Sequence, residues 1–440
     1  MNFGEMTSSE NNKPVGVAIL GLGTVGSQVL RLLGEHETDF TARIGGEVQV
    51  RGVAVSDASK PREGVDPSLI IDKPEELIDR EDVDIVVEVI GGIDYPRELV
   101  LRALRAGKSV VTANKALVAA HAAELSAAAD EAGVDLFYEA AVAAAVPVVG
   151  MLRRSLAGDK IVRISGIVNG TTNFVLDAMD STGASYEDAL AEATRLGYAE
   201  ADPTADVEGH DAASKAAIMA ALGFHSRVTF DDVHCEGITG ITAADISAAK
   251  EAGQTIKLLS ICERIVDEDG REAISARVHP TLVDRSHPLA SVSESYNAIF
   301  VESEAAGQLM FYGNGAGGNP TASAVLGDLV GAARNKVHGG RAPGESTYAD
   351  LPVADFGQVT TRRQIDMTVR DRAGVLAVIS QTFSEHGISL QTVRQEAAEN
   401  GARLIVVTHA AREHEIAETI DALGGDDEVL SVDSVIRLAD

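Results

Sequence analysis

The stretch Val15-Gly-Val-Ala-Ile-Leu20, which runs directly into Gly21-Leu-Gly-Thr-Val-Gly26, decides the fold of the N-terminal part of this chain. The first six residues are apolar and predict a buried strand, and the residues after the glycines predict a helix. A strand, a tight glycine turn and a helix in this order bind the pyrophosphate of a dinucleotide. Gly21 permits the turn, Gly23 leaves room for the phosphates, and Gly26 lets helix and strand approach.

Further apolar runs extend this unit into a sheet. Residues 48–55, 83–90 and 109–112 predict strands, and an alanine-rich helix follows to about Ala132. Strands that alternate with helices predict a parallel sheet covered on both faces, which is a Rossmann-type doubly wound α/β fold.

The pattern changes after residue 160. Residues 161–168, 273–278 and 298–301 predict strands, and 186–196 and 210–222 predict helices, in a second, mixed α/β unit. A helix that opens at Pro320 is expected to end near Ala333, because residues 335–351 show little periodicity. The tail predicts a ferredoxin-like unit of order β-α-β-β-α-β over 364–369, 374–386, 389–396, 403–409, 413–423 and 429–438.

Composition narrows the classes of partner. With 37 basic and 67 acidic residues the formal net charge is −30, which argues against nucleic-acid binding. No apolar run is long enough to predict a membrane span. Cys235 and Cys262 are the two cysteines and have no CxxC spacing, so we expect neither a disulfide nor a zinc site, and a reducing cytoplasm fits.

The end of the second predicted strand bears on the choice of cofactor. Asp57 is placed to accept from a ribose hydroxyl, as expected for NAD, whereas Lys60 and Arg62 are placed to meet the 2′-phosphate of NADP. A solvated loop explains all three residues equally well. The sequence therefore leaves NAD and NADP open.

The strongest catalytic pattern lies in residues 197–215. Glu200 and Asp206 fall in a turn-rich stretch, whereas Asp211 and Lys215 are four residues apart and share a helix face. Such a pair is usually a solvated salt bridge, but the following residues are apolar and indicate a buried helix. Carboxylates suit the ammonium of an amino-acid substrate, and a partly desolvated lysine suits a general acid.

An ordered series of motifs resembles the homoserine dehydrogenase family. The series is GLGTVG (21–26), VEVIGG (87–92), TANKALV (112–118), ISGIVNGTTNFVL (164–176), LGYAEADPTADVEGHDAASK (196–215) and GNGAGGNPTASAVLGDLV (313–330). The tail, with Asp371-Arg-Ala-Gly-Val-Leu376, resembles an ACT domain. The two together resemble the monofunctional, feedback-regulated members of the family.

The resemblance implies a division into domains. It implies an NAD(P)-binding Rossmann domain (14–150 with 313–340), a mixed α/β catalytic and dimerisation domain (151–312) and a ferredoxin-like ACT domain (361–440). Composition predicts the remaining parts, which are a polar, disordered leader (1–13) and a linker (341–360).

The resemblance also implies roles for individual residues. Lys215 is the favoured acid/base beside Asp211, and Lys115 is a second catalytic candidate. Glu200, Asp206 and Asp211 are expected to bind the substrate. The residues expected to bind the cofactor are Gly21, Gly23, Thr24, Val25, Gly26, Gly91, Asn114, Lys115, Gly197 and Gly317.

A monovalent cation is implied at one further place. The family binds Na⁺ or K⁺ through a glutamate and backbone carbonyls, which correspond here to Glu139, Val142, Ala144 and Val146. This chain has Ala144 and Ala145 where the family commonly has glycine. The backbone carbonyls are present with either residue, but alanine restricts the backbone more than glycine does.

The implied reaction is the reversible, NAD(P)-dependent reduction of L-aspartate 4-semialdehyde to L-homoserine, on the route to threonine, methionine and isoleucine. The resemblance further implies a threonine effector near Gly374 and Gly387, and a homodimer or homotetramer. Two alternatives are another Rossmann amino-acid dehydrogenase and a non-catalytic amino-acid sensor.

Overall fold

The computed structural model describes residues 13–62, 64–267, 269–398 and 401–439. The leader predicted over residues 1–13 falls almost entirely outside this range. The chain folds into two compact units: unit 1 comprises Met1–Ala157 and Asn314–Ser346, and unit 2 comprises Gly158–Gly313 and Thr347–Asp440.

Unit 1 contains the predicted Rossmann-type sheet. Its strands are Val15–Leu20 (β1), Val48–Ala54 (β2), Ile70–Ile71 (β3), Ile85–Glu88 (β4), Ser109–Thr112 (β5) and Leu136–Phe137 (β6). They pair in parallel in the order β3-β2-β1-β4-β5-β6. This order is the doubly wound one, with the chain reversing direction beside β1, so the predicted fold class is confirmed.

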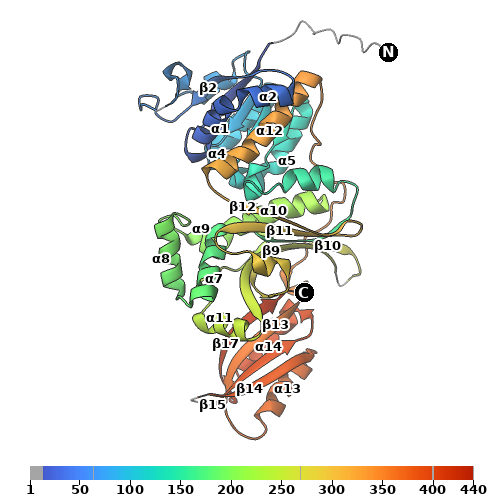
Figure 1. Ribbon diagram of the computed structural model, residues 1–440. Coiled ribbons are helices and arrows are strands. Elements are labelled where there is room, and N and C mark those ends of the chain that lie inside the picture. Colours follow the sequence, from blue (N-terminus) through green and yellow to red (C-terminus); the bar gives the residue numbers. More distant parts are fainter. Residues whose placement is uncertain (1–12, 63, 268, 399–400, 440) are drawn as a thin grey trace, which may run out of the picture. The chain divides into compact units, whose positions relative to one another are not determined.

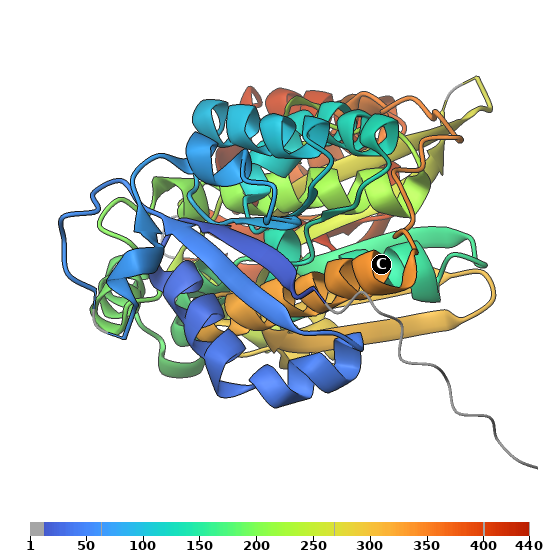
Figure 2. The ribbon, with the colours of Figure 1, turned by 90° about the horizontal axis from the view of Figure 1, so that it is seen from above.

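Helices cover both faces of this sheet. They are Thr24–Glu35 (α1), Glu37–Ile44 (α2), Pro74–Ile78 (α3), Asp94–Arg105 (α4), Lys115–Ala132 (α5), Ala140–Ala143 (α6) and Gly318–His338 (α12). Figure 2 shows the dark blue helices and the orange α12 on one face and the light blue and cyan helices on the other. The strands are therefore buried on both sides, which explains why β1 reads as one continuous apolar run.

The predicted end of α12 is wrong. The helix continues past Ala333 to His338 and ends where Gly339 adopts a left-handed conformation with φ 74°. Its last turn carries Lys336 and His338, and the positive charge of the lysine suits a helix C-terminus. Apolar periodicity is weak in this turn because these side chains interact with polar groups, such as the carbonyl oxygen of Ile44, 3.0 Å from His338 Nε2.

Unit 2 is built on a mixed sheet. Its first strands are Ile161–Ile167 (β7), His234–Cys235 (β8), Gln254–Val266 (β9), Glu272–Asp284 (β10), Tyr296–Ser303 (β11) and Gly307–Asn314 (β12). The helices that accompany them are Gly170–Thr182 (α7), Tyr186–Leu196 (α8), Thr204–Val207 (α9), His210–Phe224 (α10) and Ala243–Glu251 (α11). The mixed α/β character predicted for this region is confirmed.

The extent of two strands was not foreseen. β9 was not predicted at all, and β10 was predicted only over 273–278. Both strands are buried on both faces, so neither alternates between apolar and polar residues. In addition, β10 buries Arg277, His279 and Thr281, residue types that usually mark a surface.

The C-terminal segment follows the predicted order. Its elements are Thr360–Val369 (β13), Val375–Glu385 (α13), Leu390–Ala398 (β14), Gly401–Thr408 (β15), Ala411–Arg412 (β16), Glu413–Gly424 (α14) and Val429–Leu438 (β17). The ferredoxin-like order is confirmed, with a short extra strand before α14. We call residues 360–439 the ACT segment.

The ACT segment shares a sheet with the rest of unit 2 (Figure 1). Among the described residues the strand order is β12-β11-β7-β9-β10-β17-β13-β15-β14. The junction is a parallel pairing of β10 with β17, in which Thr281 lies beside Arg437 and Leu282 beside Leu438. The amide of Ala439 also donates to the carbonyl of Leu282 at 2.8 Å. One continuous sheet therefore spans both parts.

No helix in the described ranges combines the length and the apolar character that crossing a bilayer requires.

A buried carboxylic acid in unit 1 makes stability depend on pH. Asp328, on α12, accepts a hydrogen bond from the amide of Glu139 at 2.7 Å. Burial raises the pKa of Asp328 to about 7, and this outweighs the hydrogen bond, which lowers it. The folded protein thus keeps a proton that the unfolded chain releases at a lower pH, so stability is lost as pH rises toward 7.

We predict that Asp328→Asn stabilises the protein at pH 8 and that the gain shrinks toward pH 5. The slope is roughly 1.4 kcal/mol per pH unit between about pH 4 and 7, because asparagine cannot ionise. Thermal melts of the variant and the wild type across this range measure it, with Asp39→Asn on the exposed face of α2 as the control. A gain independent of pH would contradict the argument.

Candidate active site

The glycine turn of unit 1 has the shape that a bound pyrophosphate requires. Gly21 adopts φ 104°, and a Cβ at Gly26 would lie 2.1 Å from the carbonyl oxygen of Gly21. A Cβ at Gly23, in contrast, would meet nothing within 4 Å. Gly23 caps α1 without a side-chain hydrogen bond, and Thr24 and Val25 are the first residues of the helix. The turn therefore presents helix N–H groups to an open space.

Gly317 lies beside this turn. It caps α12 with φ 107°, and a Cβ on the adjacent Gly318 would lie 2.9 Å from the carbonyl oxygen of Thr24. The N-termini of α1 and α12 thus meet, although the two helices are almost 300 residues apart in the chain. Two helix N-termini at one place reinforce the electrostatic preference for an anion.

A buried carboxylate organises the neighbouring strand ends, and sequence reasoning missed it. Glu88, at the end of β4, is fully buried; its Oε1 accepts from the amide of Ile90 at 2.8 Å, and its Oε2 accepts from Thr112 Oγ1 at 2.5 Å. Asn114 caps α5, and its Nδ2 donates to the carbonyl of Gly92 at 2.7 Å. These bonds fix the loop that contains Gly91, whose φ is 86°.

The loop after β2 is held mostly by its own residues. Asp57 Oδ1 accepts from the amide of Ser59 at 3.0 Å and from its hydroxyl at 2.6 Å. These hydrogen bonds lower the pKa of Asp57. Lys60 Nζ lies 3.7 Å from Asp57 Oδ2, and Arg62 donates to the carbonyls of Asp57 and Lys60. One carboxylate oxygen of Asp57 therefore already accepts two hydrogen bonds.

Unit 2 brings the predicted Lys215, Asp211 and Asp206 into one cluster. Lys215 Nζ donates to Asp211 Oδ2 at 2.7 Å and to the carbonyl of Val168 at 2.6 Å. Only 9% of the Lys215 side chain and 5% of the Asp211 side chain are exposed. The pair is therefore not the solvated salt bridge that its spacing alone would usually indicate.

Two residues of the NGTTN motif complete this cluster. Asn169 caps α7, and its Nδ2 donates to Asp206 Oδ1 at 2.7 Å and to Asp211 Oδ2 at 2.9 Å. Thr171 Oγ1 lies 2.6 Å from the carbonyl of Tyr198 and 3.2 Å from Asp206 Oδ2. Neither was named as a site residue. The polar run Asn-Gly-Thr-Thr-Asn directly after a buried strand was the available signal.

The other predicted residues lie as follows. Glu200 is exposed, whereas Asp211 and Lys215 are buried. Gly197 ends α8 with φ 81°. Lys115 opens α5 and is exposed; it belongs to unit 1, whereas Lys215 belongs to unit 2.

The region predicted to hold a monovalent cation has a distinctive backbone. Glu139 Oε1 accepts from the amides of Val148 and Val149 at 2.6 and 2.8 Å, and Oε2 accepts from Gly150 at 2.7 Å. Ala144 adopts φ 45°, a conformation that favours glycine. Val142, Ala144 and Val146 are buried, and no backbone hydrogen bond of the described residues ends on their carbonyls.

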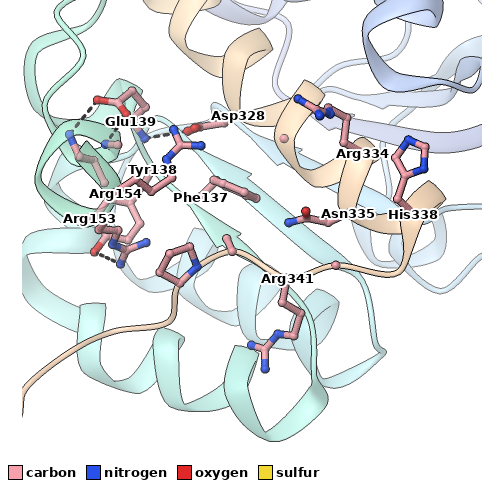
Figure 3. A pocket seen from close by; sticks show the side chains of 16 residues that line it. Phe137, Tyr138, Glu139, Arg153, Arg154, Asp328, Arg334, Asn335, His338 and Arg341 are labelled. Atoms are coloured by element: carbon pink, nitrogen blue, oxygen red, sulfur yellow. Dashed lines mark hydrogen bonds between the residues drawn. The ribbon is translucent and has the colours of Figure 1, made fainter. Parts of the chain in front are cut away.

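A hollow of about 310 Å³ opens beside Glu139 (Figure 3). Arg153 donates to the Tyr138 hydroxyl at 2.7 Å inside it, and Asp328 lies at its wall. Of the predicted site residues it includes only Glu139, so it is distinct from both the glycine turn and the lysine cluster.

Comparison with known proteins finds family models that match three successive parts of the chain. Residues 21–139 match the family described as homoserine dehydrogenase, NAD binding domain, residues 147–330 match homoserine dehydrogenase, and residues 363–425 match the ACT domain. A homoserine dehydrogenase of Corynebacterium glutamicum is 70% identical over 424 residues, which is 96% of this chain and 95% of the relative. That of Bacillus subtilis is 39% identical over 97% of this chain and 98% of its own.

Solved structures agree. The crystal structure of a homoserine dehydrogenase from Thiobacillus denitrificans superposes with a TM-score of 0.91 at 39% identity, over 97% of this chain and 99% of that one. A hyperthermophilic archaeal homoserine dehydrogenase in complex with NADPH has a TM-score of 0.61 at 28% identity, over 76% of this chain and 99% of that one.

The doubly wound sheet, its glycine turn and the buried lysine–carboxylate cluster define a nicotinamide-dependent oxidoreductase. The family matches and the relatives then narrow this class. The chain belongs to the homoserine dehydrogenase family and carries an ACT domain.

Substitutions at two glycines of the turn are expected to affect cofactor binding and thermal stability differently. We predict that Gly23→Ala leaves the melting temperature nearly unchanged but weakens cofactor binding about tenfold or more, because the new methyl group enters the open space. Gly26→Ala, whose Cβ would clash with Gly21, is expected to lower the melting temperature by several degrees. Thermal melts and titration with NADPH fluorescence test both, and equal behaviour of the two variants would refute the distinction.

Proposed function

We propose that this protein catalyses the NAD(P)-dependent interconversion of L-aspartate 4-semialdehyde and L-homoserine. The observation that carries the proposal is the buried Lys215 ammonium, held 2.7 Å from Asp211 and adjacent to Asp206 through Asn169. This set combines a proton donor with carboxylates that suit an amino-acid ammonium group. In this assignment residues 14–150 with 313–340 bind the cofactor, and 151–312 bind the substrate.

The proposed roles follow from these contacts. Lys215 delivers a proton to the oxygen that becomes the hydroxyl of homoserine, and its charge stabilises that oxygen as it becomes negative. Asp211 positions Lys215, and Asp206 and Glu200 receive the substrate ammonium. A bound nicotinamide would supply the hydride. Gly21, Gly23, Thr24, Val25, Gly26, Gly91, Asn114, Lys115, Gly197 and Gly317 are assigned to cofactor binding, and Lys115 is the second catalytic candidate.

We assign a preference for NADP to the loop after β2. One Asp57 oxygen already accepts two hydrogen bonds from Ser59, which disfavours its use for a ribose hydroxyl. Lys60 is 74% exposed at its side chain and therefore available to a 2′-phosphate. A ribose hydroxyl of NAD would have to bind the other oxygen, Asp57 Oδ2, which lies 3.7 Å from Lys60 Nζ.

We further propose a Na⁺ or K⁺ ion at Glu139, Val142, Ala144 and Val146. Three buried carbonyls without backbone partners form a suitable donor set for a monovalent cation, and Glu139 adds the negative charge. Such an ion would hold the turn between α6 and residues 148–150.

Regulation and assembly complete the proposal. The ACT segment binds an amino-acid effector, threonine, near Gly374 and Gly387, and the protein acts in the cytoplasm as a homodimer or homotetramer. The ACT match and the left-handed Gly374 (φ 98°) and Gly387 (φ 75°), which shape the turns at both ends of α13, support the effector site.

Turnover tests the function directly. The purified protein is expected to reduce NADP or NAD with homoserine, followed by nicotinamide absorbance, and Lys215→Met to lose at least about a hundredfold in kcat while binding cofactor normally. Lys257→Met, another buried lysine of unit 2, controls for the loss of a buried charge. Turnover of another amino or hydroxy acid instead would favour the alternative dehydrogenase, and no turnover by folded protein would favour the sensor.

The cofactor assignment has its own test. We predict that Lys60→Ala raises the KM for NADP about fivefold to tenfold and leaves the KM for NAD unchanged, because only NADP carries the 2′-phosphate. Lys73→Ala, at another exposed lysine of unit 1, serves as the control. Equal effects on both cofactors would exclude Lys60 as the determinant.

A further inference from the structure

A series of contacts within unit 2 connects the last strand of the ACT segment to Asp206, one of the carboxylates that we assign to substrate binding. It begins at Arg437 on β17, whose side chain is only 3% exposed. Its Nη1 donates to Glu236 Oε2 at 2.6 Å, and its Nη2 donates to Glu236 Oε1 at 2.7 Å. Glu236 directly follows β8, outside the ACT segment. Two parallel bonds fix the orientation of the pair as well as its distance.

Arg437 is held firmly from the ACT side. Its Nε donates to Glu413 Oε1 at 2.9 Å, and Glu413 also accepts from Thr361 Oγ1 and from Arg363. Glu413 and Arg363 are buried, so the two arginines and two glutamates form a balanced set. Displacing Arg437 would leave Glu236, Glu413 and Arg363 with an excess negative charge, which is unfavourable because Glu413 and Arg363 are buried.

Aromatic contacts hold the same group together. His234 Nε2 lies 2.8 Å from Glu236 Oε1, and its ring stacks on Phe356 with a centroid separation of 3.5 Å. Arg437 lies over the same phenylalanine ring at 5.0 Å. Burial alone would raise the pKa of Glu236, but the hydrogen bonds from His234 and Arg437 outweigh it and hold the pKa well below its usual range. Glu236 is therefore charged at neutral pH.

The backbone around Glu236 rests directly on the helix that carries Asp206. The amide of Ile238 donates to the carbonyl of Val207 at 2.8 Å, and Cys235 Sγ donates to the carbonyl of Glu208 at 3.3 Å. A Cβ at Gly237 would lie 2.2 Å from the Val207 carbonyl oxygen, so no side chain fits between the two segments. A shift of residues 235–238 therefore has to shift α9.

We propose that Glu236 is a positioning residue: its ion pair with Arg437 sets the location of Asp206 and transmits ligand binding in the ACT segment to the substrate site. The transmission part rests on the proposed regulation by an amino acid. The positioning part requires only that Asp206 contributes to substrate binding. A pair that merely braced the fold would affect stability and leave the KM for homoserine unchanged.

The test compares two charge-removing variants of the full-length protein. Glu236→Gln keeps the shape of the side chain and removes the charge. Asp366→Asn removes the charge from another ion pair, between Asp366 on β13 and Arg403 on β15, that lies wholly inside the ACT segment and away from Gly374 and Gly387 in sequence, and it serves as the control. The measurements are the KM for homoserine, the KM for the cofactor, kcat, and amide hydrogen exchange over residues 204–209.

We expect Glu236→Gln to raise the KM for homoserine about fivefold and to speed exchange in residues 204–209, with kcat and the cofactor KM within about twofold of wild type. Asp366→Asn should do neither. Wild-type KM and exchange in Glu236→Gln would overturn the proposal. If that variant does not fold, Arg437→Lys replaces it. This substitution keeps the charge and removes the two parallel hydrogen bonds of the guanidinium group, so we expect the same changes in KM and exchange.

Inhibition assays with threonine distinguish the positioning role of Glu236 from its role in transmitting ligand binding. If threonine inhibits the wild type, Glu236→Gln should be less sensitive and Asp366→Asn as sensitive as the wild type. Equal sensitivity of all three proteins would overturn transmission through the pair of Glu236 and Arg437. If threonine does not inhibit the wild type, the proposed regulation fails and transmission fails with it, while the KM and exchange data still decide whether Glu236 positions Asp206.

Discussion

The buried ammonium of Lys215 is the charge on which the arrangement of unit 2 depends. Removing an ammonium from water costs several kcal/mol unless acceptors replace the lost water, and here Asp211 and the carbonyl of Val168 do so. Val168 follows β7, and Asp211 lies in the first turn of α10. The end of a strand and the start of a helix must therefore meet at one point. Asn169 then joins Asp206 to the same point through its amide.

Unit 1 also contains a buried charged side chain, the carboxylate of Glu88, whose charge is opposite to that of Lys215. Glu88 is fully buried at the end of β4, and its carboxylate is satisfied by Thr112 on β5 and by the amide of Ile90. Both groups lie at the carboxyl ends of adjacent parallel strands, where ligands of doubly wound folds bind. The Glu88 carboxylate holds the loop that contains Gly91 in place by accepting from the amides of Ile90 and Gly91.

The sequence predicted those parts of the fold whose signals are local. The glycine turn after β1 and the helix periodicity around Asp211 and Lys215 each lie within a few residues, so they could be recognised. β9 and the full length of β10 could not, because strands buried on both faces lose the alternation that identifies a strand. Glu88, Asn169 and Thr171 become site residues only through partners more than twenty residues away. The exposed position of Glu200 likewise depends on how the turn folds and not on its residue type.

The pairing of β10 with β17 has a mechanical consequence. A hinge requires a few residues free to change their backbone angles, and a strand seam with a buried ion pair beside it does not provide them. A swing of the ACT segment as a separate body would have to break this pairing and the ion pair between Arg437 and Glu236. A signal that leaves these contacts intact has to travel as a small sliding or twisting of strands. The same seam restricts the engineering of chimaeras. A regulatory segment transplanted from a relative would have to bring a last strand whose edge matches β10, since a cut at the linker alone leaves an unpaired sheet edge on both sides.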